Sequence, residues 1–241
     1  MKFLIIATAR SGTTLLTTFL HSHPDLTCYA EEGLDFINNL KNNEGANIKY
    51  GRLRDFSHLS KSSDFKLIHL IRKDLLYLAL SKVINKYKKK LGKPSHIYPG
   101  KELKDLGFSI SDSYPNRDIL INSLAKSARL TTRDNVIYIP ILELFWKMLL
   151  TTQEVIKWNK KLKGRALTIF YEDITNNNNV NIMPQDIADK ICDYIEVKRA
   201  QLKTPMKKVN PRNYEDYISN WNQIKNLGKG LRNYYEKRVS A

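Results

Sequence analysis

The segment that most constrains the fold of this chain is an apolar run that leads through a short polar turn into a helix. Residues 3–7 are continuously apolar, which is typical of a strand buried on both faces of a sheet. The turn at 10–14 reads Arg-Ser-Gly-Thr-Thr, and its Gly12 can take backbone angles that other residues avoid. Apolar residues then recur at helical spacing over 15–20. Such a turn points backbone N–H groups and a helix N-terminus at one place, so it predicts an anion site.

Further apolar runs predict the rest of a sheet. Residues 65–71 (FKLIHLI) and 166–170 (ALTIF) have the pattern of buried strands, and 26–29 is a shorter candidate. Helical patterns separate these runs along the chain. Strands alternating with helices predict an α/β fold, a three-layer sandwich with a central parallel sheet.

The segments between the strands are predicted from periodicity and from Pro and Gly positions. Residues 42–63 are polar and weakly patterned, so we interpret them as a loop with room for one turn of helix. Residues 95–116 are interpreted as a long excursion of the kind that carries substrate specificity. A turn is expected at 228–230. We find no internal repeat and no clear linker. The first helix is expected over the apolar pattern at 15–20, with Pro24 ending it, and the other expected helices are 34–40, 75–90, 118–130, 140–162 and 184–195.

The charge of the chain indicates an anionic partner. Its 241 residues carry a formal net charge of +16, which favours nucleotides, nucleic acid or sulfated and phosphorylated surfaces, although part of the excess fits ordinary solvated faces. The two cysteines, Cys28 and Cys192, form no paired motif, which predicts a reducing, cytoplasmic compartment. No stretch approaches the roughly 18 apolar residues that a membrane span needs.

The turn at 10–14 differs from the best-known phosphate loop. The pattern G-x-x-x-x-G-K-[ST] is absent, and no pair of magnesium ligands is evident beside it, so we expect it to hold a phosphate-like anion without a metal. Arg10 adds a forked donor suited to phosphate or sulfate. Arg10, Glu31 and Arg72 each follow an apolar strand, and ligands of parallel sheets bind where the strands end. These three residues are therefore predicted to converge on one site.

Two motifs together resemble a known family. ARSGTTLL followed by HPDLTCYAEE is similar to the start of the sulfotransferases that use 3′-phosphoadenosine 5′-phosphosulfate, in particular the protein-tyrosine and bacterial carbohydrate-type branches. The family's second motif is an arginine that closes a strand and a serine on the next helix; here these are Arg72 and Ser81 in IRKDLLYLALS, and a spacing one residue shorter would point to Lys73. The YED at 171–173 is a supporting resemblance. The likeness covers most of the chain and implies a single sulfotransferase-like domain over 1–241.

The resemblance implies an activity and a set of site residues. The activity is transfer of a sulfuryl group from 3′-phosphoadenosine 5′-phosphosulfate to a hydroxyl acceptor, leaving 3′,5′-adenosine bisphosphate and needing no metal. Glu31 is implied as the base, or Glu32 if the loop carries an insertion, and Arg10 as the residue that neutralises the leaving group. A sugar, a glycolipid, a tyrosine or a small metabolite all stay open as the acceptor. The implied cofactor-binding residues are Arg10, Ser11, Gly12, Thr13, Thr14, Arg72 and Ser81.

Two other functions compete with this one. A P-loop-type nucleotide or small-molecule kinase would need a lysine in the loop and metal ligands. A basic nucleic-acid-binding protein would account for the charge, but no helix-turn-helix, zinc or RNA-binding signature occurs.

Several polar residues have simpler roles. We predict that His69 is a core residue, that His23 fixes a turn, and that Glu172 and Asp173 tie a strand end to neighbouring loops. Trp221, with Lys229 and Arg232, is a candidate to cover the nucleotide, as the C-terminal loop of the resembling family does.

Overall fold

The computed structural model describes residues 1–29, 34–52, 64–90, 138–175, 181–205, 214–216 and 218–240. Its centre is a sheet in the order β2-β3-β1-β4-β5, in which every neighbouring pair of strands is parallel. This confirms the predicted α/β class. The strands are β1 (Lys2–Ala7), β2 (Thr27–Tyr29), β3 (Glu44–Lys49), β4 (Phe65–Ile71) and β5 (Ala166–Phe170).

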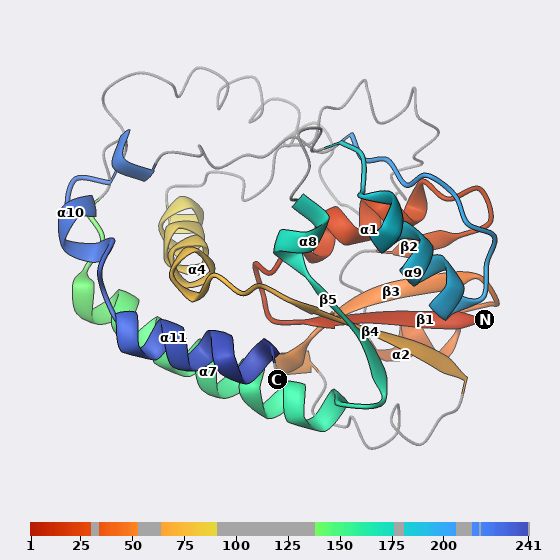
Figure 1. Cartoon of the computed structure of the whole chain (residues 1–241), viewed down its shortest axis with the longest axis horizontal. Helices are drawn as coiled ribbons and strands as arrows, with labels where there is room; N and C mark the ends of the chain where they lie inside the picture. The colour runs from red at the N-terminus through yellow and green to blue at the C-terminus, as the bar shows by residue number, and fades with distance from the viewer. Residues whose placement is uncertain are drawn as a thin grey trace.

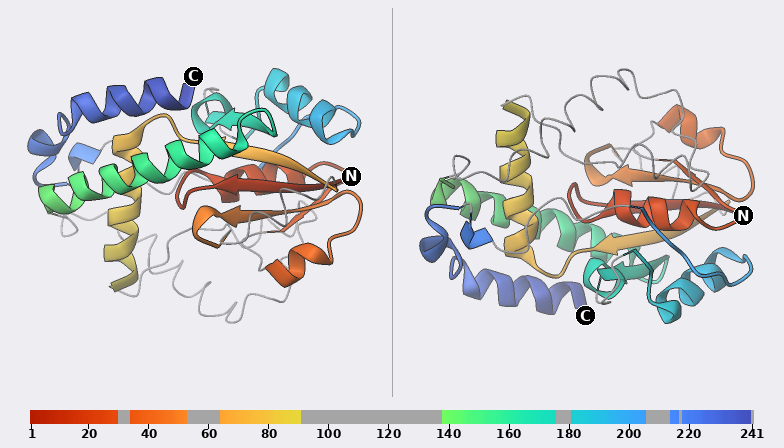
Figure 2. Two further views of the ribbon diagram at one scale, coloured as in Figure 1. Left: turned by 90° about the horizontal axis from the view of Figure 1, so that it is seen from below. Right: turned by 90° about the horizontal axis from the view of Figure 1, so that it is seen from above.

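Helices cover both faces of the sheet, which makes the three predicted layers. One layer holds α1 (Thr13–His21), α8 (Tyr171–Thr175) and α9 (Gln185–Ile195), and the opposite layer holds α2 (Leu34–Asn38) and α7 (Ile141–Leu162) (Figure 1). The long helix α7 crosses the sheet and runs beside α11 (Lys229–Ser240), as Figure 2 shows from two sides. Beyond the carboxyl ends of the strands lie α4 (Leu75–Lys90) and α10 (Trp221–Ile224). Short 3₁₀ turns occur at Tyr50–Arg52 and Tyr214–Asp216.

The core is divided by the sheet because successive strand side chains point to opposite faces. In β1, Phe3 and Ile5 pack against the layer of α1 and α9, while Leu4 and Ile6 pack against the layer of α2, α4 and α7. All four side chains are fully buried. The continuous apolar pattern of this strand therefore reflects burial on both faces, as the sequence predicts.

The prediction of a loop over 42–63 is wrong where it covers β3. This strand lies between β2 and β1 and shows little apolar pattern, because two of its buried positions hold Gly45 and Asn47. A Cβ at Gly45 would overlap the ring of Phe3, so only glycine fits there. The Asn47 side chain donates to Thr17 Oγ1 at 3.0 Å, which satisfies its buried amide.

The other predicted elements agree closely with the structure, with two corrections at helix ends. The helix expected over 34–40 ends at Asn38, and α11 begins at Lys229, so the expected turn is confined to Gly228 (φ +62°). The first helix ends at His21, before Pro24, as predicted. Pro140 and Pro184 stand at the N-caps of α7 and α9, as expected. The predicted excursion at 95–116 and helix at 118–130 lie outside the described residues.

Within the described ranges, no helix is long and apolar enough to cross a bilayer. The same ranges contain no group of three His, Cys, Asp or Glu side chains placed to bind a metal. Both cysteines, Cys28 and Cys192, are buried and unpaired.

Candidate functional site

The turn between β1 and α1 has an unusual backbone. Arg10 (φ +71°) and Gly12 (φ +98°) are both left-handed, and the fully buried Ser11 lies between them. Alternating backbone handedness curls a chain so that successive N–H groups point to one side and form an anion-binding concavity. The Ser11 hydroxyl donates to the carbonyl of Thr8 at 2.7 Å, so it closes the turn internally. Gly12 takes its left-handed angle at no steric cost, whereas such an angle is uncommon for an arginine.

The N-terminus of α1 starts directly from this turn. Gly12 is its N-cap and makes no side-chain cap, and no acidic residue lies in the first turn of the helix. The first N–H groups of a helix have no partner within the helix, so those at Thr13 and Thr14 are available to an anion. Thr13 is buried, whereas Thr14 is partly exposed.

Gly12 also makes room for an aromatic ring. A Cβ at this position would overlap ring carbons of Tyr171, the first residue after β5. The other neighbour of that ring is Arg72, whose guanidinium carbon lies 4.7 Å from the ring centroid. Tyr171 is therefore packed between the loop and the arginine, a position that the sequence did not indicate. Burial raises the pKa of the Tyr171 hydroxyl, and the positive charge of Arg72 opposes this shift.

The structure brings Arg10 and Ser81 into direct contact. Arg10 Nε donates to Ser81 Oγ at 3.1 Å, although the two residues are 71 positions apart. Ser81 lies on α4 and is buried. The first and second motifs predicted from the sequence therefore meet at the carboxyl edge of the sheet.

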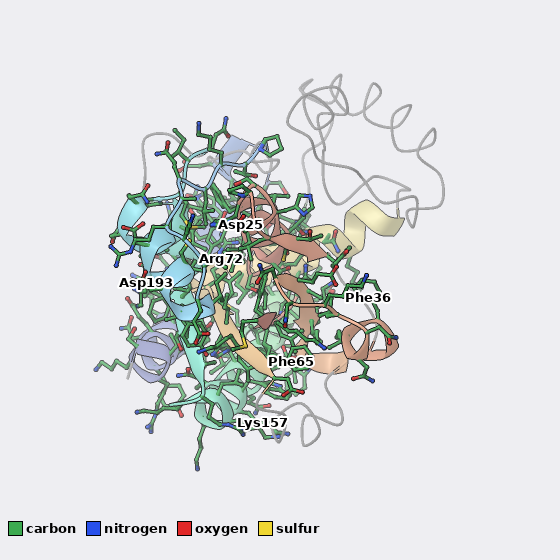
Figure 3. All side chains as sticks on the ribbon, turned by 90° about the vertical axis from the view of Figure 1, so that its right-hand side faces the viewer. Asp25, Phe36, Phe65, Arg72, Lys157 and Asp193 are labelled. Carbon is green, nitrogen blue, oxygen red and sulfur yellow. The ribbon has the colours of Figure 1, made fainter. Side chains whose placement is uncertain are left out.

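Arg72 directly follows β4 at the same edge of the sheet, and its label lies near the centre of the molecule in Figure 3. Its backbone carbonyl accepts a hydrogen bond from the Tyr235 hydroxyl at 2.7 Å. Its Nε is buried and has no hydrogen-bond partner among the described residues. A buried guanidinium donor without an acceptor is costly, and an anion would satisfy it.

Lys73, the alternative to Arg72, points elsewhere. Its Nζ lies 3.7 Å from Asp173 Oδ1 and 4.0 Å from the ring centroid of Phe170. The backbone N–H groups of Lys73 and Asp74 donate to Glu172 at 3.0 and 3.2 Å. Glu172 and Asp173 thus tie the end of β5 to the end of β4, as the sequence predicts.

A second polar cluster joins Thr8, at the start of the loop, to helices α4 and α7. Lys82, next to Ser81 on α4, donates to Thr8 Oγ1 at 2.7 Å and to Thr151 Oγ1 at 3.0 Å. Thr8 in turn donates to Glu154 Oε2 at 2.7 Å. The sequence analysis missed this cluster. One signal was present, since Lys82 follows the helical spacing of the buried Leu75 and Leu78 and so interrupts an apolar stripe.

The structure places His69 in the core and His23 at the turn after α1, as predicted, although His69 Nδ1 has no hydrogen-bond partner among the described residues. His69 is fully buried within β4, and its Nε2 lies 2.5 Å from the Tyr50 hydroxyl. Burial lowers the pKa of His69 to about 4, so the ring is neutral at neutral pH. His23 accepts a hydrogen bond from the Asp25 N–H at 3.0 Å and its other ring nitrogen bonds the Lys198 carbonyl, which fixes the turn after α1.

The structure describes the residues predicted to cover the nucleotide but not the predicted base. Glu31 and Glu32 lie outside the described residues, although the strand before them, β2, ends at the same edge of the sheet as β1 and β4. Trp221 stacks on Tyr214 and meets Tyr77 edge-on, so it belongs to an aromatic group beside α4. Arg232 donates to the Lys225 carbonyl within the C-terminal segment.

Comparison with known proteins gives no match to a family model and none to a curated protein. Solved structures do resemble the chain over nearly its whole length at low sequence identity. A sulfotransferase from Alicyclobacillus acidocaldarius is 11% identical with a TM-score of 0.49, covering 99% of this chain and 93% of that one. The sulfotransferase domain from the curacin biosynthetic pathway is 13% identical with a TM-score of 0.49, covering 99% and 96%. Mouse sulfotransferase SULT7A1, complexed with PAP, is 11% identical with a TM-score of 0.48, covering 98% and 88%.

Proposed function

We propose that this chain is a sulfotransferase that moves a sulfuryl group from 3′-phosphoadenosine 5′-phosphosulfate to a hydroxyl acceptor. The observation that carries the proposal is the pairing of two donor sets at one edge of the sheet. One is the left-handed turn at Arg10–Gly12 with the uncapped N-terminus of α1. The other is Arg72, whose buried Nε lacks an acceptor in the part of the chain that the structure describes. A nucleotide with phosphate groups at two ends matches two separated donor sets, whereas a single inorganic anion does not.

The residues present fit this nucleotide. The N–H groups of Gly12, Thr13 and Thr14 and the guanidinium of Arg10 would hold the 5′-phosphosulfate end, because fixed donors at a helix N-terminus favour negative charge. Arg72 and Ser81 would hold the 3′-phosphate. Lys73 is a poorer candidate than Arg72, since its ammonium is paired with Asp173. When bound, the nucleotide supplies the sulfuryl group and a phosphate leaving group.

The chain supplies charge stabilisation and proton transfer. Arg10 and the turn amides neutralise the charge that grows on the leaving phosphate, a contribution of about 10²–10³ in rate for one such donor. The hydrogen bond from Arg10 Nε to Ser81 Oγ directs the arginine side chain toward α4. It thereby joins the residues proposed for the two ends of the nucleotide. Glu31, or Glu32 in its place, would take the proton of the acceptor hydroxyl. The acceptor is a molecule with a free hydroxyl, of the sugar, glycolipid, tyrosine or small-metabolite class.

A ligand comparison tests the proposal. We expect 3′,5′-adenosine bisphosphate to raise the melting temperature more than ATP with magnesium does, because only the bisphosphate presents a 3′-phosphate to Arg72. At 100 times the dissociation constant a ligand stabilises by about 2.7 kcal/mol, which for a domain of this size is a rise of roughly 5–10 °C. Stabilisation by ATP with magnesium and none by the bisphosphate would overturn the proposal and favour a kinase.

A further inference from the structure

The polar cluster around Lys82 joins the end of β1 to helices α4 and α7 through a buried ammonium. The Lys82 side chain is only 10% exposed, and its Nζ lies 2.7 Å from Thr8 Oγ1, 3.0 Å from Thr151 Oγ1 and 3.8 Å from Glu154 Oε2. The Thr8 hydroxyl also donates to Glu154 at 2.7 Å. Thr8 leaves β1, Lys82 belongs to α4, and the other two residues belong to α7. Lys82 of α4 therefore links Thr8, at the start of the loop, to helix α7.

Stability does not account for a lysine at this place. Burial lowers the pKa of Lys82 to about 8, and the charge of Lys147 acts in the same direction, while Glu154 opposes both. Among the described residues these two groups of α7 are the charged neighbours that act on Lys82, and its contact from β1, Thr8, does not titrate. Replacement of both members of a buried ion pair by apolar side chains is often neutral for stability, whereas removal of one member is costly when the other charge stays buried. Glu154 is 38% exposed, so water can hydrate it without Lys82.

The contacts of Thr8 lead into the anion loop. Its hydroxyl is held between Lys82 and Glu154, and its carbonyl accepts the Ser11 hydroxyl at 2.7 Å. The neighbouring helix residue, Ser81, accepts from Arg10 Nε. Ser81 and Lys82, which are consecutive on α4, thus contact Arg10 and Thr8 at one turn, and Lys82 contributes a positive charge.

We propose that Lys82 is a positioning residue of the anion loop, acting through Thr8, and that the loop binds the nucleotide fully only while this ammonium is protonated. The inference rests on the proposed function, since it names a residue that supports the same nucleotide site.

The sign of the pH dependence follows from linkage. An anion in the loop favours the charged ammonium, so binding takes up a proton once the pH exceeds the pKa of about 8 in the free protein. Affinity is therefore complete below that value and falls above it. Folding stability has the opposite trend: the reference pKa of 10.5 exceeds the folded value of about 8, so the unfolded chain binds more protons between them and stability rises over that window.

The test compares Lys82→Met with Lys86→Met. Lys86 lies one turn further along α4 and pairs with Glu143 of α7 at 2.6 Å, but its side chain is 56% exposed and this contact does not involve the loop. Affinity for 3′,5′-adenosine bisphosphate is measured by calorimetry between about pH 7 and pH 9.5, and melting temperatures are measured without ligand over the same range. Thr8→Val provides a second variant that breaks the contact and leaves the lysine in place.

We expect wild type and Lys86→Met to lose affinity about tenfold for each unit by which the nucleotide raises the pKa of Lys82. Lys82→Met should bind about tenfold more weakly at pH 7, show no decline up to pH 9.5, and melt no lower than wild type. Thr8→Val should also weaken binding at pH 7.

Three results would count against these ideas. Unchanged affinity and an unchanged pH profile in Lys82→Met overturn this inference alone. A parallel loss of melting temperature and affinity in Lys82→Met, with the pH decline kept, assigns Lys82 a purely structural role. A wild-type chain that binds no bisphosphate at any pH overturns the proposed function and this inference together.

Discussion

Two strand-to-helix junctions lie side by side at the carboxyl edge of the sheet, and they differ in how the free N–H groups at the start of the helix are satisfied. At the junction of β4 and α4, Asp74 Oδ1 accepts the N–H of Tyr77 at 3.0 Å, and Glu172 accepts the N–H groups of Lys73 and Asp74. At the junction of β1 and α1, no side chain caps the helix and its first turn holds no acidic residue. The protein's own carboxylates satisfy the first junction, whereas no side chain caps the helix at the second.

The difference shows that one parallel sheet can have a helix N-terminus capped by its own side chains beside another that is left uncapped. A helix N-terminus favours negative charge wherever it occurs. At α4 that preference is met by Asp74, whose carboxylate caps the helix. At α1 the left-handed turn leaves the first N–H groups of the helix uncapped. Arg10 adds a positive charge to the partial positive charge of this helix N-terminus. Three substitutions probe this contrast, in order of expected effect.

Gly12→Ala should have the largest effect, because it changes the backbone of the turn between β1 and α1. The new Cβ would overlap the Tyr171 ring and would also force a left-handed backbone at φ +98°, which by itself costs roughly 1–2 kcal/mol. We expect no measurable binding of 3′,5′-adenosine bisphosphate by calorimetry and a lower melting temperature. Gly164→Ala is the control, since φ is +73° there but no atom lies within 4 Å of the added carbon. Retained binding in Gly12→Ala would show that the turn is not the anion site.

Arg72→Ala should weaken the bisphosphate by about 10–100-fold, because a hydrogen bond to a charged group contributes roughly 1.5–3 kcal/mol. Adenosine 5′-monophosphate, which lacks the 3′-phosphate, should lose much less affinity. Lys73→Ala is the matched control one residue away, and its pairing with Asp173 predicts little change for either ligand. Equal losses for both nucleotides in Arg72→Ala would place the 3′-phosphate elsewhere.

Asp74→Ala should have the smallest effect, and only on folding. Loss of an N-cap costs about 1 kcal/mol, which lowers the melting temperature by roughly 2–4 °C in a domain of this size. Affinity for the bisphosphate, measured on the folded variant, should stay within about twofold of wild type. A loss of affinity as large as that of Arg72→Ala would mean that the capped junction also holds the ligand.

Much of this contrast could be predicted from the sequence. The runs at 3–7, 65–71 and 166–170 are buried strands because continuous apolar residues need cover on both faces. The turn at 10–14 was predicted as an anion site because glycine and hydroxyl residues precede a helical pattern. The strand β3 was missed, since Gly45 and Asn47 are buried by contacts with Phe3 and Thr17 that lie far away along the chain.

The sequence by itself determined the local conformations: apolar strands, the left-handed turn around Gly12, and the helices that follow Pro140 and Pro184. Only the tertiary structure decided which side chains meet. Arg10 reaches Ser81, and Lys82 reaches Thr8 and Glu154, because the parallel sheet gathers distant strand ends at one edge and α4 and α7 pack beside it. The physical reason is that backbone preferences act between near neighbours, whereas the fate of a buried charge depends on partners that only the packed fold supplies.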